Sequence, residues 1–210
     1  MDFENLYLRS LTSIILLISF FIILYFFDSY LFVVTFLIYV IIGYEIYINF
    51  KKTSYLLILI LYLILSFICI QVYFIYYYNQ IFFIYFIFVI ITFDTFSYIF
   101  GSFFGKKKIF KSISPSKTYM GLFFGIISTL LLGSIVNYYF KIIFFDYFIF
   151  FTLLIIASSF IGDIIESYFK RKIHIKDSSK FLPGHGGFFD RLDGFIMSSI
   201  FLLLFKYYFI

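Results

Sequence analysis

Long hydrophobic runs make up most of the chain, and short polar segments separate them. Runs long enough to cross a bilayer as helices occupy residues 11–27, 30–49, 54–76, 80–103, 119–140, 146–169 and 193–210. The pattern therefore predicts an all-α, polytopic integral membrane helix bundle with about seven transmembrane helices. The first run has no small-residue cleavage site, so we interpret it as a span and not as a cleaved signal peptide.

The composition supports a membrane environment. Hydrophobic residues make up 64% of the chain and charged residues 13%, whereas a soluble domain has about a quarter charged residues. The chain contains one cysteine, Cys69, in an apolar run, so no disulfide framework is expected. We expect Cys69 to be an ordinary hydrophobic residue.

Basic residues predict how the spans are oriented. If the spans alternate as drawn, only Lys141 and Lys206 fall on one side of the membrane. The other side receives Arg9, Lys51, Lys52, Lys106, Lys107, Lys108, Lys111, Lys117, Lys170, Arg171, Lys172, Lys176, Lys180 and Arg191. Because cytoplasmic loops are enriched in Lys and Arg, the N-terminus is predicted inside and the C-terminus outside. The net charge of +5 is thus explained by topology and gives no reason to expect nucleic-acid binding.

Two predicted cytosolic loops, 104–118 and 170–192, contain both prolines and 11 of the 16 basic residues. Any chemistry is expected there. In the first loop, "SPSKT" precedes a helix and offers hydroxyls and a lysine, which suit a phosphate group. In the second, "PGHGG" at 183–187 provides a flexible backbone that allows close approach to a ligand. His185 is interpreted as a hydrogen-bond donor to a phosphate or as a proton carrier.

Several carboxylates lie where a purely structural role is hard to assign. Asp94 is inside a span, where an ionised group needs a partner. Asp163 and Glu166 are three residues apart and share a helical face, and Asp190 and Asp193 repeat that spacing. Hard oxygen ligands favour Mg²⁺. The alternative is that these carboxylates neutralise neighbouring basic residues at helix ends.

Two further features receive structural interpretations. Glu45, near the inner end of the second span, is expected to snorkel towards the membrane surface. "GSFFGKKK" at 101–108 differs from a phosphate-binding P-loop in its glycine spacing, and no Ser or Thr follows its lysine. Gly101 and Gly105 are instead expected to allow close helix packing.

The segment "SYFKRKIHIKDSSKFLPGHGGFFDRLD", Ser167–Asp193, resembles the signature of phosphatidate cytidylyltransferases, also called CDP-diacylglycerol synthases. Upstream, "DTFSYIFGSFFGKKK", "SISPSKTYMG" and "GDIIESYFKR" are similar to other blocks of that family. The resemblance covers roughly residues 94–194. Met120 departs from it, because the family usually has Glu or Gln there, and the resemblance leads us to expect that one or two of the family's N-terminal spans are missing.

The resemblance implies transfer of a cytidylyl group from CTP to phosphatidic acid, giving CDP-diacylglycerol and pyrophosphate. It implies a bacterial inner (plasma) membrane protein whose active site faces the cytosol, among membrane lipids. It also implies Mg²⁺ as cofactor, with room for a second cation, and leaves a homodimer open.

With this reaction in mind, the candidate site residues fall into three groups. The predicted catalytic residues are His185, Lys170, Arg171 and Asp193. The predicted substrate-binding residues are Ser114, Ser116, Lys117, Thr118, Lys176, Asp177, Gly186, Gly187 and Arg191. The predicted metal ligands are Asp163, Asp190, Glu166 and Asp94.

The chain is expected to form a single membrane domain, 1–210. Within it we expect N-terminal helices (1–93), a catalytic core (94–194) and a final helix (195–210). Two alternatives remain. A transferase acting on a polyprenyl phosphate would usually show an Asp-Asp pair, which this chain lacks. A cation or proton transporter using Asp94 and Asp163 would usually show repeated halves, and none is visible.

Overall fold

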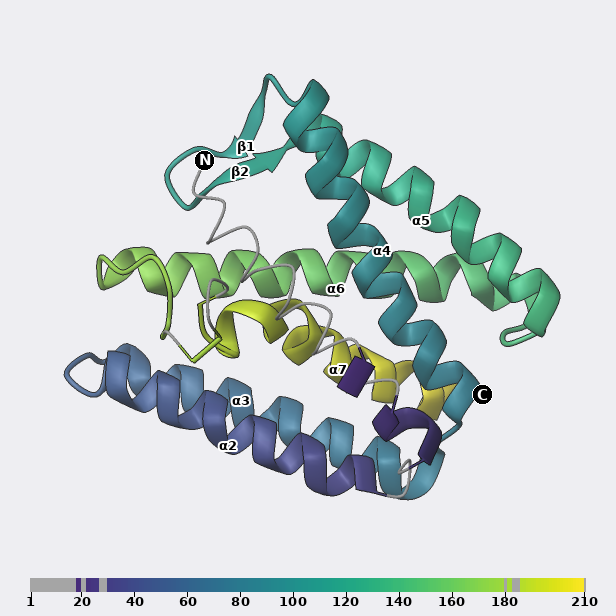
Figure 1. Cartoon of the computed structure of the whole chain (residues 1–210), viewed down its shortest axis with the longest axis horizontal. Coiled ribbons are helices and arrows are strands. Elements are labelled where there is room, and N and C mark those ends of the chain that lie inside the picture. Colours follow the sequence, from purple (N-terminus) through teal and green to yellow (C-terminus); the bar gives the residue numbers. More distant parts are fainter. Residues whose placement is uncertain (1–17, 20–21, 27–29, 180, 183–185, 210) are drawn as a thin grey trace.

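The computed structural model describes residues 18–19, 22–26, 30–179, 181–182 and 186–209. Its elements are shown in Figure 1. They are α2 (Leu31–Phe50), α3 (Tyr55–Val72), the π-helical turn η2 (Tyr73–Tyr77), α4 (Gln80–Phe104), β1 (Lys108–Phe110), β2 (Ser114–Thr118), α5 (Tyr119–Phe140), α6 (Phe145–Lys172) and α7 (Phe189–Phe209).

Six helices in the described part of the chain are long and apolar enough to cross a membrane. This confirms the predicted helical membrane fold. The predicted span 11–27 lies largely outside the described residues, although 18–19 and 22–26 are helical. The total of seven spans and the sides on which the termini lie therefore stay predictions.

Helix boundaries agree with the hydrophobic pattern except at α7. The Thr118 hydroxyl accepts a hydrogen bond from the Gly121 N–H at 3.1 Å and so begins α5 at Tyr119. In the same way, the Asn79 side chain caps α4. The sequence placed the last span at 193–210, but α7 begins earlier, at Phe189. Asp190 and Arg191 are therefore helical residues in the first turn.

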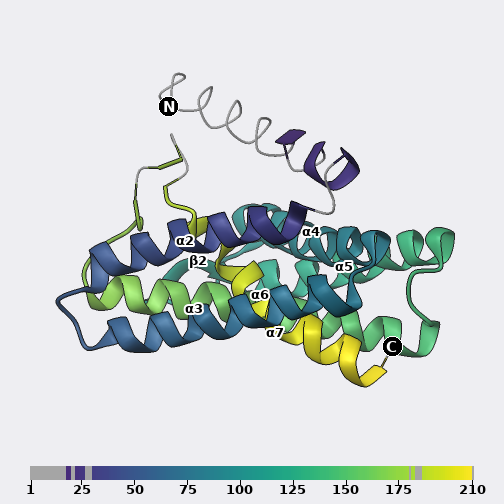
Figure 2. The ribbon, with the colours of Figure 1, turned by 90° about the horizontal axis from the view of Figure 1, so that it is seen from below.

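Most contacts between helices are made by a few pairs of adjacent helices. α4 packs against α5, α6 against α7, and α3 against both α2 and α7. In Figure 2, α2, α3 and α6 run in roughly the same direction, and Figure 1 shows α7 between α6 and the other two. Aromatic rings fill much of the core, with the Phe151 ring centroid 4.7 Å from that of Phe205 and 5.0 Å from that of Phe82. Cys69 is buried, as expected of a hydrophobic residue.

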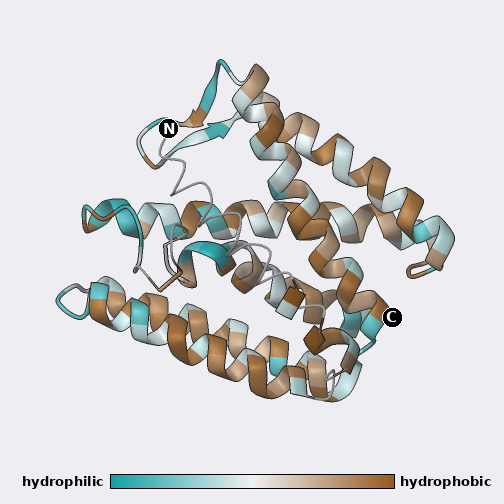
Figure 3. Cartoon of the chain, in the orientation of Figure 1, coloured by the Kyte–Doolittle hydropathy of each residue, from teal (hydrophilic) through white to brown (hydrophobic). Residues whose placement is uncertain are grey.

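Apolar side chains cover the outside of the bundle. Leu57, Leu61 and Ile135 are all more than half exposed, which suits a surface in contact with lipid tails. Hydrophilic residues gather instead at the end of the bundle where α6 ends, α7 begins and the β-hairpin lies (Figure 3). The described structure thus presents one strongly polar end.

The segment 104–118 was expected to be a loop, but much of it forms an antiparallel hairpin. Lys108 pairs with Thr118 and Phe110 with Ser114, and the register shifts between these pairs. The Tyr119 N–H also donates to the Lys107 carbonyl at 3.1 Å. The hairpin therefore holds β2 in a fixed direction as it enters α5.

Candidate active site

A cavity of about 320 Å³ opens among α4, β2, α5, α6 and α7. It combines charged and hydroxyl groups with aromatic and aliphatic walls. Its lining residues are Phe93, Asp94, Ser97, Tyr98, Ser116, Lys117, Thr118, Gly121, Leu122, Phe160, Asp163 and Arg191. Six of the residues predicted from the sequence meet there: Asp94, Ser116, Lys117, Thr118, Asp163 and Arg191.

Lys117 of β2 and Asp163 of α6 both line the cavity and form an ion pair with each other. The Lys117 ammonium also lies 4.7 Å from the centre of the Phe160 ring, which provides a cation–π contact. Both side chains keep part of their surface exposed, at 17% and 19%. The pair is therefore accessible to a ligand and not sealed in the core.

Asp94 of α4 and Asp163 of α6 bring two carboxylates to the same cavity, and Arg191 of α7 brings a second basic side chain. Among the described residues, no three His, Cys, Asp or Glu side chains lie close enough together to hold a metal ion on their own. Mg²⁺ in phosphoryl-transfer enzymes is commonly held by one or two carboxylates together with substrate phosphates. Asp94 and Asp163 fit that arrangement.

Close contact between α4 and α5 shapes one wall of the cavity. A Cβ atom on Gly121 would lie 2.5 Å from the Ser97 carbonyl oxygen and 3.1 Å from the Gly101 Cα. The Ser97 hydroxyl donates to the Gly121 carbonyl at 3.0 Å. Gly101 thus has the close-packing role expected for it, and Gly121 shares it.

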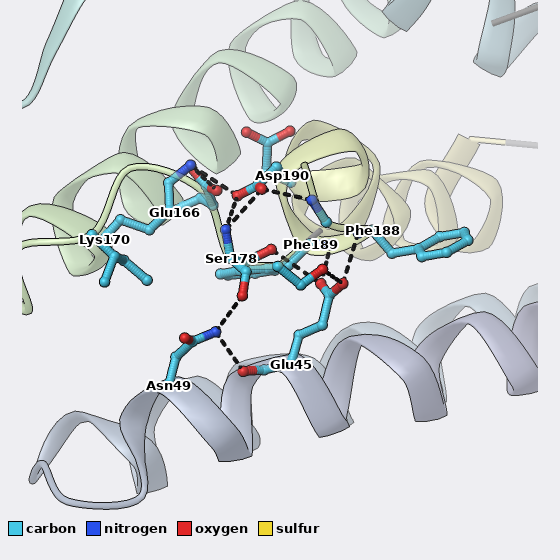
Figure 4. Close-up of polar contacts among 12 residues, drawn as sticks. Glu45, Asn49, Glu166, Lys170, Ser178, Phe188, Phe189 and Asp190 are labelled. Carbon is cyan, nitrogen blue, oxygen red and sulfur yellow. Dashed lines mark hydrogen bonds and ion pairs between the residues drawn. The ribbon is translucent and has the colours of Figure 1, made fainter. Parts of the chain in front are cut away.

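A second polar cluster lies at the start of α7 (Figure 4). The Lys170 ammonium is 2.5 Å from the Glu166 carboxylate and 2.9 Å from that of Asp190. The Asp190 carboxylate also accepts hydrogen bonds from the Ser178 N–H at 2.8 Å and the Gly187 N–H at 2.8 Å. Asp190 therefore joins α6, the preceding loop and α7.

The four predicted metal ligands are thus divided between two places. Asp94 and Asp163 line the cavity, whereas Glu166 and Asp190 share Lys170 in the second cluster. The ion-pairing interpretation of the carboxylates applies to this second pair and, through Lys117, to Asp163 as well. Lys170, predicted as catalytic, is 8% exposed and is not among the described residues that line the cavity.

Glu45 of α2 contradicts its sequence interpretation. It does not snorkel, because it is only 1% exposed and its carboxylate lies inside the protein. It accepts hydrogen bonds from the N–H groups of Phe188 (3.0 Å) and Phe189 (2.8 Å). The hydroxyls of Ser178 (3.1 Å) and Ser179 (2.6 Å) also donate to it (Figure 4). We call Glu45 and these four donors the Glu45 clamp.

The clamp explains the glycine at 187. A Cβ atom there would lie 2.7 Å from both carboxylate oxygens of Glu45 and would overlap the Ser178 hydroxyl. The N–H groups at 187–189 are already bonded to Asp190 and Glu45. The Gly187 N–H, which was expected to bind substrate, therefore binds the Asp190 carboxylate in this structure.

The remaining predicted residues lie around these two clusters. Gly186, at φ +88°, exchanges backbone hydrogen bonds with Leu182. The exposed Arg171 side chain donates to the carbonyls of Ile113 (3.3 Å) and Ile175 (3.2 Å) and so joins α6 to the hairpin. Lys176 and Asp177 are exposed, and Ser114 is buried in β2. His185 lies outside the described residues.

Asp193 lies on α7 near the carboxylates of α6. Its side chain accepts a hydrogen bond from the Gly194 N–H at 2.8 Å. Its backbone carbonyl faces Gly162, at which no Cβ atom would fit. It is not among the described lining residues of the cavity, so the structure assigns it no direct contact with a ligand there.

Among the site residues that the sequence interpretation missed, Glu45 and Asn49 bind the segment before α7 from another helix. The Asn49 side chain, one turn after Glu45, donates to the Ser178 carbonyl at 2.6 Å. A usable signal existed, because Glu45 is the only acidic residue in an otherwise apolar span. An ionisable residue within a membrane helix usually has an interior partner.

Comparison with known proteins places this geometry in a family. A family model described as the cytidylyltransferase family matches residues 46–209. The chain belongs to the cytidylyltransferase family. The match includes both polar clusters and the hairpin, and it begins one residue after Glu45.

Similar proteins within this family come from several bacteria. The chain is 40% identical over 124 residues to a phosphatidate cytidylyltransferase of Rickettsia conorii, which covers 55% of this chain and 53% of the relative. It is 40% identical over 105 residues to the Staphylococcus epidermidis protein of that name, covering 49% and 40%. For the Helicobacter pylori protein the identity is 42% over 104 residues, covering 48% and 39%. The chain thus spans about half the length, or less, of these curated relatives.

Proposed function

We propose that this chain transfers a cytidylyl group from CTP to phosphatidic acid, giving CDP-diacylglycerol and pyrophosphate. The observation that carries the proposal is the cavity between α4, α5, α6 and α7, in which Lys117 and Arg191 face the same space as Asp94 and Asp163. A site for two phosphate compounds needs positive side chains for their charge and carboxylates for a cation. The relatives named phosphatidate cytidylyltransferase support this assignment.

The reaction requires little beyond positioning and charge neutralisation. A phosphate oxygen of phosphatidic acid attacks the α-phosphorus of CTP. The bond from that phosphorus to the bridging oxygen of the β-phosphate breaks, and pyrophosphate leaves with the electron pair. Holding the two phosphates in line supplies much of the rate enhancement.

The side chains of the cavity divide this work. Lys117 and Arg191 bind phosphate oxygens, and the hydroxyl of Ser116, an exposed residue of β2, adds a hydrogen-bond donor. Asp94 and Asp163 would hold Mg²⁺ together with substrate phosphates. When bound, that cation neutralises charge that develops on the phosphates. The aromatic and aliphatic wall of Phe93, Tyr98 and Leu122 suits the lipid substrate.

We further propose that the polar end of the bundle faces the cytosol of a bacterium from its inner membrane. The basic side chains of the hairpin and of the end of α6 lie at this end, and cytoplasmic segments are enriched in Lys and Arg. CTP is a soluble nucleotide and reaches the site from that side. A homodimer remains a proposal.

The test is an assay of the purified, detergent-solubilised chain with labelled CTP and phosphatidic acid in the presence of Mg²⁺. The expected result is lipid-soluble labelled CDP-diacylglycerol and release of one pyrophosphate per product. Product formation with a polyprenyl phosphate in place of phosphatidic acid would reassign the acceptor. Cation uptake into proteoliposomes without nucleotide turnover would support the transporter alternative and contradict the proposal.

A further inference from the structure

The Glu45 carboxylate is buried and is satisfied by hydrogen bonds from neutral donors. Burying a charged carboxylate is costly unless hydrogen bonds satisfy it, and a carboxylate has about four lone-pair sites. All four donors of the Glu45 clamp are present, two peptide N–H groups and two hydroxyls. None of the ion pairs found among the described residues involves Glu45. Its charge is satisfied by the loop before α7 and by the first amides of that helix.

The clamp acts on the beginning of α7. The first N–H groups of a helix lack partners within the helix, and a negative charge there is stabilised by the helix dipole. The Phe188 N–H donates to Glu45, and the Phe188 carbonyl accepts the N–H groups of Arg191 (3.2 Å) and Leu192 (3.0 Å). Phe188 therefore connects the Glu45 carboxylate to the backbone of Arg191 through its own N–H and carbonyl groups.

Arg191 is a lining residue of the cavity, so its backbone position decides where its guanidinium lies. Asn49, on the same helix as Glu45, holds the Ser178 carbonyl, and Asp190 holds the Ser178 N–H. Ser178 is thus held from α2 on one side and from α7 on the other. A change at Glu45 would loosen the loop and the first turn of α7 together.

We propose that Glu45 is a positioning residue for the reaction, acting through the first turn of α7 to place Arg191 in the cavity. The inference rests on the proposed function. Glu45 is not among the described lining residues of the cavity, and its carboxylate hydrogen-bonds to Ser178, Ser179, Phe188 and Phe189, which do not line it either. Its role is to hold the backbone that presents Arg191 and Asp190.

The test variant is Glu45→Gln, which keeps the size of the side chain but replaces one acceptor oxygen by an NH₂ donor. Thr35→Val is the matched control. Thr35 is also a buried polar residue of α2, but it bonds to Leu31 and Gln71 far from the clamp. Both variants are compared with wild type by thermal stability, by hydrogen exchange of the 178–189 segment, and by kcat and KM for CTP and phosphatidic acid.

We expect Glu45→Gln to raise hydrogen exchange within 178–189 and to lower kcat about 10–100-fold, the range that small misplacements of reacting groups produce. Thr35→Val should leave hydrogen exchange within 178–189 and kcat unchanged. This should hold even if Thr35→Val lowers thermal stability as much as Glu45→Gln does. In an Arg191→Lys background, Glu45→Gln should reduce kcat by a much smaller factor, because residues that act through one another are not additive.

The inference would be overturned if Glu45→Gln lowered kcat by the same factor in the wild-type and Arg191→Lys backgrounds, or if it left kcat at the wild-type value. Faster exchange without a loss of kcat would overturn it as well. If Glu45→Gln does not fold, the double variant Ser178→Ala with Ser179→Ala removes two of the four donors and should show a smaller loss with the same dependence on Arg191. A wild-type chain that forms no CDP-diacylglycerol contradicts the proposed function, whereas an active wild type with a neutral Glu45→Gln contradicts only the role of Glu45.

Discussion

Lys117 extends from the end of β2 into the cavity, where it contacts Asp163 and the Phe160 ring. As a compact ammonium it can bind a phosphate as a point charge. Lys117→Ala should therefore raise KM for one substrate at least about tenfold, since a charge-assisted hydrogen bond contributes about 1.5–3 kcal/mol. Steady-state kinetics with each substrate varied in turn measures this.

Lys111→Ala is the control for that change. Lys111 lies in the exposed turn of the same hairpin and does not line the cavity. It carries the same charge, so both variants alter the net charge of the polar end equally. An equal rise in KM in the two variants would show that Lys117 acts through the general surface potential and not as a ligand.

Asp163 and Asp190 should respond differently to the same chemical change, because they lie in different clusters. Asp163→Asn should remove most activity and leave thermal stability near wild type, since Asp163 is partly exposed in the cavity. Asp190→Asn should lower activity and stability together, because Asp190 accepts two peptide N–H groups and pairs with Lys170. Breaking a buried pair costs about 3–5 kcal/mol.

Activity assays and thermal unfolding of the two Asp variants in detergent separate these effects. A Mg²⁺ titration adds a second distinction, because Asp163→Asn should raise the Mg²⁺ concentration needed for half-maximal activity. Asp190→Asn should leave that concentration unchanged if its carboxylate serves only the loop. A larger shift in Asp190→Asn than in Asp163→Asn would reassign the cation site to the second cluster.

At the residue scale, the side chains of the site were easier to select from the sequence than their roles were to assign. Asp94, Lys117, Asp163 and Arg191 were selected from the sequence and meet in one cavity. Glu45 was misinterpreted, because its partners are 133–144 positions away along the chain and only the packing of α2 against the loop reveals them. Gly187 was expected to bind substrate, because the contact of its N–H with the Asp190 carboxylate cannot be read from the sequence.

At the element scale, the contact of α4 with α5 depends on glycines that face each other. Gly121→Ala would push a methyl group against the Ser97 carbonyl, which is backbone and cannot rotate away. Overpacking of this kind costs about 1–3 kcal/mol. Because Gly121 also lines the cavity, we expect Gly121→Ala to lower both thermal stability and activity.

Gly43→Ala is the matched change for Gly121→Ala in another apolar helix. A Cβ atom on Gly43 would meet only the Leu63 side chain, at 3.6 Å, which is ordinary van der Waals contact. Alanine also has the higher helix propensity, so Gly43→Ala should retain wild-type stability and activity. Comparable destabilisation in the two variants would mean that the α4–α5 contact is less tight than described.

Most elements could be predicted because each membrane helix is a local feature, set by a run of apolar residues with polar residues at its ends. The start of α7 and the hairpin could not. Phe189 begins α7 because Glu45 bonds its N–H from another helix, and hydropathy does not register such a contact. The strands at 108–110 and 114–118 contain polar residues with no alternating pattern, so only their pairing defines them.

For the whole molecule, the helices bring residues from α2, α4, α6, α7 and the hairpin to one polar end. The predicted division into N-terminal helices and a catalytic core at residue 94 stays a prediction. Glu45 and Asn49 nevertheless hold the loop of the predicted core from the N-terminal side of that boundary. The N-terminal helices therefore contribute directly to the geometry of the site.

The orientation of this polar end is tested by labelling single cysteines in a Cys69→Ser background. Ser112, in the hairpin turn, and Lys176, after α6, are exposed at the polar end, whereas Phe144, between α5 and α6, is 77% exposed in the opposite loop. Ser178 is unsuitable for labelling because it is buried and bonded to Glu45.

In intact cells, a membrane-impermeant thiol reagent should label Phe144→Cys. It should reach Ser112→Cys and Lys176→Cys only after the inner membrane is opened, because the basic residues favour a cytosolic polar end. Labelling of all three in intact cells would indicate a leaky preparation, and a native cytosolic thiol protein serves as the control for that. The reverse pattern, with Ser112→Cys labelled and Phe144→Cys protected, would put the cavity on the side without CTP and contradict both the orientation and the proposed reaction.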